Sequence, residues 1–225
     1  MRAFLGASVG KKLIVGLSGL FLILFLVVHL AVNLTMFAGR DTYNAVAHWM
    51  GTNPAILAMR PVLAAGLVVH ILVSSYLAWS NWRSRPERYA MVDAAGGSTW
   101  ASRHMFVLGG LVILFLGLHL SSFAIPMTFG SPPLAENSPV MKDAYALVTA
   151  RFGLWWYVSL YTAAMVFLGL HVAHGLQSAI QTVGLSNRRW RRRWARVGNV
   201  YAAVVAVGFA SLPLYFFIQS QVGSA

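Results

Sequence analysis

The sequence predicts an all-α membrane protein built as a bundle of five transmembrane helices. Three observations support this fold class. Hydrophobic residues make up 58% of the chain and charged residues only 10%, whereas a soluble domain carries about 25% charged residues. Long apolar segments alternate with short polar gaps. Lys and Arg gather in every second gap, which is typical of the cytoplasmic side of membrane proteins.

Each apolar segment is long enough to cross about 30 Å of hydrocarbon at about 1.5 Å per residue. Turn-forming pairs such as Asn53-Pro54 and Arg85-Pro86 mark the gaps. The first apolar run is longer than the core of about 7–15 residues in a signal peptide, so we expect a retained helix. We predict one domain over residues 1–225, with helices at about 13–38, 56–82, 104–127, 153–184 and 198–220.

The distribution of the 17 Lys and Arg residues predicts how the bundle is oriented. Most of them lie in the N-terminal tail and in the second and fourth gaps. The exceptions are Arg40, Arg60, Lys142 and Arg151. By the positive-inside rule we expect a cytoplasmic N-terminus and an outside C-terminus.

The net charge of +12 and the segment NRRWRRRWAR at 187–196 also suit an RNA-binding arm. Interleaved Trp and Arg are equally typical of a membrane interface, where both residue types anchor helix ends. Because the basic runs flank apolar segments, we expect the lipid bilayer as partner and no nucleic acid.

The chain contains no cysteine. This excludes disulfides, cysteine-ligated iron–sulfur clusters and thioether-attached haem within the chain. Any haem would therefore be held non-covalently, with His or Met as axial ligand.

Histidines inside the predicted spans are the main functional signal. Neutral His needs partners for two ring nitrogens, and ionisable groups in the bilayer interior are rare and costly. For any one of these residues, a hydrogen bond to a neighbouring helix is an adequate explanation. The first four predicted helices each carry at least one deep histidine, however, and the fifth carries none. Four imidazoles on four helices can form two bis-histidine haem sites.

Depth along the helices predicts how the histidines pair. His29 and His119 lie roughly 24 and 22 Å from the cytoplasmic side, and His70 and His171 roughly 18 and 19 Å. This favours an outer pair, His29 with His119, and an inner pair, His70 with His171, as axial ligands of haem iron. Gly66, one turn before His70, is expected to leave space beside that imidazole for a flat macrocycle.

Polar residues near these histidines are weaker candidates. Ser18 and Asn33 share one stripe with His29 on the first helix. On the fourth helix, His174, Ser178 and Gln181 continue the stripe of His171. We interpret the second stripe as facing the bundle interior, toward haem propionates or a quinone; interhelical hydrogen bonding explains it equally well.

Several motifs occur in order between about residues 10 and 185. They are GKKLIVGLSGLFLILFLVVHLAVNL, NAVAHWM, VVH, NWRSRPERY, GLHL and HVAHGLQSAIQTVGL. In content and spacing they resemble the di-haem cytochrome b subunit, of the b558 type, of succinate dehydrogenases and fumarate reductases.

This resemblance implies the membrane-anchor protein of succinate:quinone oxidoreductase (complex II) in the inner (plasma) membrane of a bacterium. It implies two haem b groups, with His29, His70, His119 and His171 as iron ligands and His174 beside them. The implied partners are an FAD-containing flavoprotein, which oxidises succinate in the tricarboxylic acid cycle, an iron–sulfur subunit, and a quinone, often menaquinone. A higher oligomer of the complex is compatible with the resemblance.

The quinone site departs from the family pattern. Some members carry an acidic residue at the outer start of the second helix, where this chain has Met59-Arg60-Pro61. In the first outer loop, Asp41, Tyr43 and His48 are the candidates to take the place of that acidic residue.

Two alternatives remain open from the sequence. One is a haem b anchor of another membrane redox complex, such as a hydrogenase or formate dehydrogenase. The other is a haem-free membrane protein, structural or a transporter with a histidine proton relay. Against a relay, the acidic residues all fall in predicted loops. They are Asp41, Glu87, Asp93, Glu136 and Asp143.

Overall fold

The computed structural model describes residues 8–84 and 100–222. Over these residues the chain is helical apart from turns, loops and one isolated β-bridge between Leu134 and Lys142. Five helical stretches are long and apolar enough to cross a membrane, which indicates a multi-pass membrane protein. These stretches are Val9–Ala38, Pro54–Arg83, Met105–Phe129, Trp155–Thr182 and Arg191–Val222. The predicted all-α architecture with five spans is thus confirmed for the described part of the chain.

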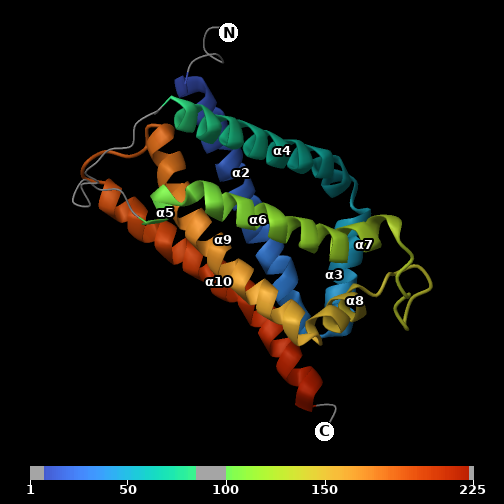
Figure 1. The fold of residues 1–225 in the computed structure, drawn as a ribbon. Coiled ribbons are helices and arrows are strands. Elements are labelled where there is room, and N and C mark those ends of the chain that lie inside the picture. Colours follow the sequence, from blue (N-terminus) through green and yellow to red (C-terminus); the bar gives the residue numbers. More distant parts are fainter. Residues whose placement is uncertain (1–7, 85–99, 223–225) are drawn as a thin grey trace.

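Figure 1 shows the helices as a bundle with short helices at its ends. The long helices are α2 (Ser8–Leu34), α4 (Pro54–Arg83), α6 (Met105–His119), α9 (Trp155–Thr182) and α10 (Arg191–Val222). The short elements are the 3-10 turn η1 (Thr35–Ala38), α3 (Arg40–Thr52), α5 (Trp100–Arg103), the π-helix η3 (Leu120–Ala124), α7 (Ile125–Phe129) and α8 (Ala144–Phe152).

Local sequence explains where the spans begin and end. The side chain of Asn53 accepts hydrogen bonds from the backbone N–H groups of Ala55 and Ile56, and Pro54 occupies the first helical position of α4. At the end of α9, Gly184 adopts a φ of +80°. The N–H of Leu185 then bonds to the carbonyl of Ile180 at 3.1 Å, which closes a Schellman motif.

Helix α9 is the centre of the packing. It contacts α2, α6, α8 and α10, and it carries ten of the 22 buried apolar residues of the described chain. Its approach to α10 is close at Gly169, where a Cβ atom would lie 3.0 Å from the Cβ of Ala206. In contrast, α4 packs mainly against α2 and α3 and has no buried residue.

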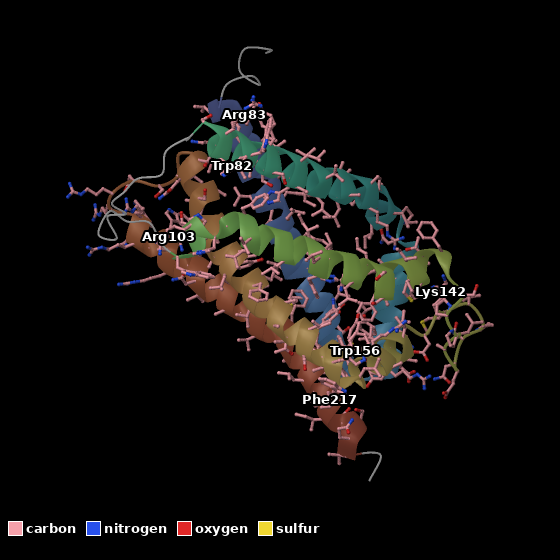
Figure 2. All side chains as sticks on the ribbon, in the orientation of Figure 1. Trp82, Arg83, Arg103, Lys142, Trp156 and Phe217 are labelled. Atoms are coloured by element: carbon pink, nitrogen blue, oxygen red, sulfur yellow. The ribbon has the colours of Figure 1, made fainter. Side chains whose placement is uncertain are left out.

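The bundle has two chemically distinct ends. We call one the basic end: it contains the start of α2, the end of α4, α5 and the loop between α9 and α10 (Figure 1). Figure 2 places Arg83 and Arg103 there, and Lys142 and Trp156 at the opposite end. We call the opposite end the cap end, because α3, α8 and the loop 130–143 cover it.

Asp143 organises the cap end. Its carboxylate is fully buried and accepts hydrogen bonds from Asn44 Nδ2 at 2.9 Å and from the N–H of Ala146 at 3.0 Å. It also forms an ion pair with Arg40, whose Nε donates at 3.0 Å. Burial alone would raise the pKa of Asp143, but these hydrogen bonds and the charge of Arg40 lower it below its ordinary value.

Candidate functional site

The structure brings four histidines together in two pairs across helices. In the outer pair, His29 on α2 faces His119 on α6, with ring centroids 5.6 Å apart and ring planes at 88°. In the inner pair, His70 on α4 faces His171 on α9, at 6.4 Å and 75°. These are the neighbours that helix depth predicts. Their role as ligands stays a prediction.

The outer histidines are held by side chains on two helices. The Nδ1 atom of His119 lies 3.0 Å from the hydroxyl of Tyr161 on α9. Asn33, one turn beyond His29, donates to the backbone carbonyl of His29 at 2.7 Å, and the same amide nitrogen lies 3.4 Å from Nδ1 of His29. The second contact is too long to fix the tautomer of that imidazole.

Ser18 contacts the imidazole of His70. The Ser18 hydroxyl lies 2.8 Å from the carbonyl of Ile14, 3.1 Å from that of Val15 and 3.2 Å from Nδ1 of His70. When the hydroxyl donates to one of these carbonyls, its oxygen can accept from an Nδ1–H group. In that tautomer the lone pair of His70 is on Nε2, the nitrogen available to a metal.

The fourth histidine differs from the others. Nδ1 of His171 is buried and has no hydrogen-bond partner among the described residues. A buried polar atom without a partner is rare in folded proteins and usually has a functional or solvent explanation.

Glycines lie beside both inner imidazoles. A Cβ at Gly19 on α2 would stand 3.3 Å from Cε1 of His70, and one at Gly109 on α6 would stand 3.6 Å from Cε1 of His171. The expectation for Gly66 was wrong. A Cβ there would come within 3.0 Å of the Phe21 ring, so Gly66 admits that ring instead of leaving open space.

Aromatic rings form an apolar wall around the outer pair. Phe25 stacks on His29 at 5.1 Å and Phe209 lies 5.5 Å from it. Phe115 and Phe123 lie 5.8 and 5.5 Å from His119. Such rings exclude water from the site and leave few polar partners for the imidazoles.

A π-helix follows His119 directly. Pro126 has no N–H, so the carbonyl of Ser122 cannot receive its usual helical hydrogen bond. The backbone widens into η3 over Leu120–Ala124, and Ser122 is buried there. Turns of this type are frequent at functional sites because they rotate the side chains on either side of them.

The geometry of both pairs is compatible with haem iron. A metal–imidazole bond is about 2.0–2.1 Å long, so two imidazoles on opposite sides of one ion have ring centroids about 6 Å apart. The observed separations of 5.6 and 6.4 Å bracket this value. Gly110 and Gly117 on α6 are exposed, and apart from neighbouring atoms of α6 itself no described atom lies within 4 Å of a Cβ built at either. This face of α6 is therefore not covered by the described chain.

The weaker candidates are not gathered in one place. Ser18 contacts His70 as described. Tyr43 is buried in the cap end, where burial raises its pKa to about 12, and His48 is half-buried on α3. On α9, His174 is half-buried, whereas Ser178 and Gln181 are exposed toward the basic end.

Comparison with known proteins gave no matching family model, no matching curated protein and no matching solved structure. The histidine pairs and the motif resemblance are therefore the observations that bear on function.

Proposed function

We propose that this chain is the di-haem cytochrome b membrane anchor of a bacterial succinate:quinone oxidoreductase. The observation that carries the proposal is the presence of two cross-helix histidine pairs, each with a separation suited to one iron. The motif resemblance supplies the complex, its flavoprotein and iron–sulfur partners, and menaquinone as the electron acceptor or donor.

Haem b held at each pair would supply reversible one-electron transfer, at a potential tuned by its surroundings. Within this chain, His29 and His119 would hold the outer group and His70 and His171 the inner one. Tyr161 and Ser18 fix the orientation of two of these imidazoles, as partners of metal-bound histidines commonly do.

The two sites lie at different depths in the bundle. On α2, Ser18 marks the level of the inner pair and His29 belongs to the outer pair, which separates them by roughly 16 Å along the helix axis. On α9, His171 and Tyr161 give a similar separation of roughly 15 Å. Two haem groups at these levels would connect the two ends of the bundle, as electron transfer between a soluble partner and a quinone requires.

The proposal also assigns the ends of the bundle. The basic end would face the cytoplasm, as the charge distribution predicts, and the iron–sulfur subunit would dock there. The chain would contribute the quinone-reacting part of the complex, while succinate is oxidised in the flavoprotein.

The test is a reduced-minus-oxidised spectrum of the purified protein. We expect a b-type α-band that falls by about half in His70→Ala/His171→Ala and in His29→Ala/His119→Ala. His104→Ala serves as control, because His104 stacks on Trp100 at 4.4 Å and belongs to neither pair. Absence of the band, or its full retention in both double variants, would contradict haem binding. Co-purification of hydrogenase or formate dehydrogenase subunits would assign the anchor to another complex.

A further inference from the structure

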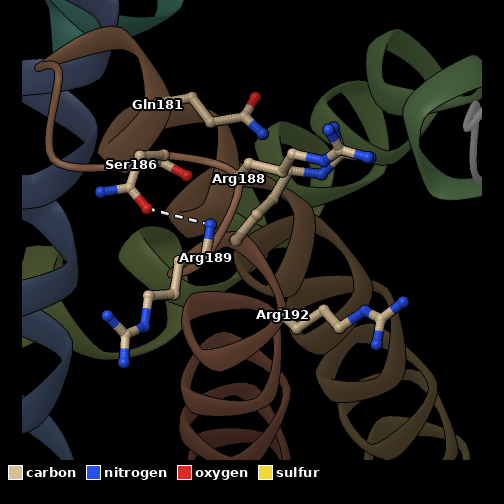
Figure 3. Close-up of a pocket in the computed structure, with 7 residues that line it drawn as sticks. Gln181, Ser186, Arg188, Arg189 and Arg192 are labelled. Carbon is tan, nitrogen blue, oxygen red and sulfur yellow. Dashed lines mark hydrogen bonds between the residues drawn. The ribbon is translucent and has the colours of Figure 1, made fainter.

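The loop between α9 and α10 forms an open pocket at the basic end, with a volume of about 780 Å³. Figure 3 shows this loop with the side chains that surround it. The lining residues are Gln181, Ser186, Asn187, Arg188, Arg189, Arg191 and Arg192. We refer to this feature as the arginine pocket.

The charge of the arginine pocket is unbalanced. Four of its lining residues are Arg and none is acidic. Within the described residues, the ion pairs join Arg40 to Glu136 and Asp143 at the cap end, so none involves the arginine pocket. Guanidinium groups that share one pocket repel one another, and an anion between them would relieve that repulsion.

The shape of the loop does not depend on the four arginine side chains. The Asn187 side chain accepts hydrogen bonds from the N–H groups of Arg189 and Trp190, both at 3.0 Å; the first is the dashed line in Figure 3. Trp194 Nε1 donates to the carbonyl of Leu185 at 3.0 Å. The backbone of the loop is therefore held in place independently of these arginine side chains.

Helix α10 adds to the positive potential. Its first residues are Arg191, Arg192 and Arg193, and its first turn has no acidic residue. Cations are unfavourable at the positive end of a helix dipole, whereas anions are stabilised there.

We propose that the arginine pocket binds the phosphate group of an anionic phospholipid. The planar guanidinium fork matches phosphate oxygens, and the neutral side chains of Gln181, Ser186 and Asn187 can donate further hydrogen bonds. The pocket joins the ends of two membrane-spanning helices and has Trp190 and Trp194 beside it, which are residues typical of the headgroup level. Basic pockets between transmembrane helices at the cytoplasmic side are suited to anionic headgroups. This proposal is independent of haem binding.

The experiment uses the full chain in a neutral detergent and follows tryptophan fluorescence during titration. The probes are short-chain phosphatidylglycerol, short-chain phosphatidylcholine and inorganic phosphate. We expect saturable binding of phosphatidylglycerol, with phosphatidylcholine and inorganic phosphate each at least tenfold weaker.

Two matched variants separate the pocket from general charge. Arg188→Gln/Arg192→Gln removes two charges from the arginine pocket and should weaken phosphatidylglycerol binding at least tenfold. Lys12→Gln/Arg83→Gln removes two charges from the same end of the bundle outside the pocket. It should change the affinity for phosphatidylglycerol less than twofold. Circular dichroism and gel-filtration profiles equal to those of the unmodified protein show that both variants fold.

Three outcomes would overturn the proposal. Equal losses of phosphatidylglycerol binding in both double variants would mean that the net positive charge of this end, and not the pocket, binds the lipid. Inorganic phosphate binding as tightly as phosphatidylglycerol would make free phosphate the ligand. A co-purified acidic protein that occupies the pocket, together with equal binding of phosphatidylglycerol and phosphatidylcholine, would make it a protein-docking surface.

Discussion

At the scale of single residues, Tyr161 is the side chain that most directly determines the orientation of the outer pair. It is 5% exposed, and its hydroxyl lies 3.0 Å from Nδ1 of His119. Its ring also stacks on Tyr157 at 4.7 Å and meets Phe115 edge-on at 4.8 Å. The ring therefore contributes packing, and the hydroxyl contributes the contact with the imidazole.

Replacing Tyr161 by Phe should keep the packing and remove only that contact. A metal-bound His119 would carry its hydrogen on Nδ1 and donate it to Tyr161, which makes the imidazole a stronger electron donor. Loss of the acceptor should raise the midpoint potential of the outer haem and leave that of the inner haem unchanged. Redox titration with optical detection measures both.

Tyr157→Phe is the matched control, because the Tyr157 ring stacks on Tyr161 but, among the described residues, the hydrogen bond to His119 comes from Tyr161. Its effect on the outer potential should be clearly smaller. Equal shifts in the two variants, or none in Tyr161→Phe, would mean that the hydroxyl does not act through His119.

At the scale of elements, the π-helix η3 directly follows His119, and we expect it to set the direction of that side chain. Pro126→Ala would restore an N–H at residue 126 that can donate to the carbonyl of Ser122, which favours a regular α-helix in place of the wider turn. We expect His119 to rotate and the outer haem to be lost or weakly held. The haem content of the purified variant should fall toward half.

Pro61→Ala in α4 is the control for a proline removed from a span. It should leave the haem content unchanged. An intact outer haem in Pro126→Ala would show that the turn does not control ligation.

The cap end gives a prediction about pH. The pKa of folded Asp143 lies below its ordinary value of 3.8, so its carboxylate form favours the folded state. Its contribution to stability is therefore full above pH 3.8 and is lost as the pH falls through the lower, folded pKa. Asp143→Asn should destabilise the cap end by on the order of 2 kcal/mol at neutral pH, through the loss of charge-assisted hydrogen bonds.

The measurement is limited proteolysis of the loop 130–143 at neutral pH and at a pH well below 3.8. Asp143→Asn should be cleaved faster at neutral pH, and its cleavage should depend less on pH than that of the unmodified protein. Asp41→Asn is the control, because Asp41 is exposed and its carboxylate accepts, among the described residues, a single long hydrogen bond of 3.5 Å from Asn137. An unchanged pH dependence in Asp143→Asn would contradict the assignment.

Elements also show what could be predicted from the sequence. Apolar length predicted the five spans, because hydrophobicity and helix length are properties of each segment alone. The prediction placed the start of the fifth span at residue 198, whereas α10 begins at Arg191, since a basic and aromatic first turn has the composition of a loop. The short helices α3 and α8 were missed, because their stability depends on the Asp143 network between segments distant in sequence.

The candidate site was predictable only in part for the same reason. Depth along a helix can be counted from the sequence, and it suggested which histidines are neighbours. Rotation of each helix about its axis cannot be counted in this way. The contacts of Tyr161, Gly19 and Gly109 with the imidazoles depend on that rotation, so no sequence pattern indicated them.

At the scale of the whole molecule, the two histidine pairs, the basic end and the cap end lie along one axis of the bundle. This arrangement fits a protein that connects a soluble redox partner at one end with a quinone at the other. The exposed surface of α4, which has no buried residue, is available to lipid or to a partner protein.

The central claim is that the bundle holds two haem groups, one at each histidine pair. Its most direct test is the haem content per chain of the purified full-length protein, measured as the pyridine haemochrome against protein concentration. The proposal predicts two haem b per chain, and one in each double variant of a pair. A content near zero in protein that remains folded and membrane-inserted would contradict it and would favour a haem-free membrane protein.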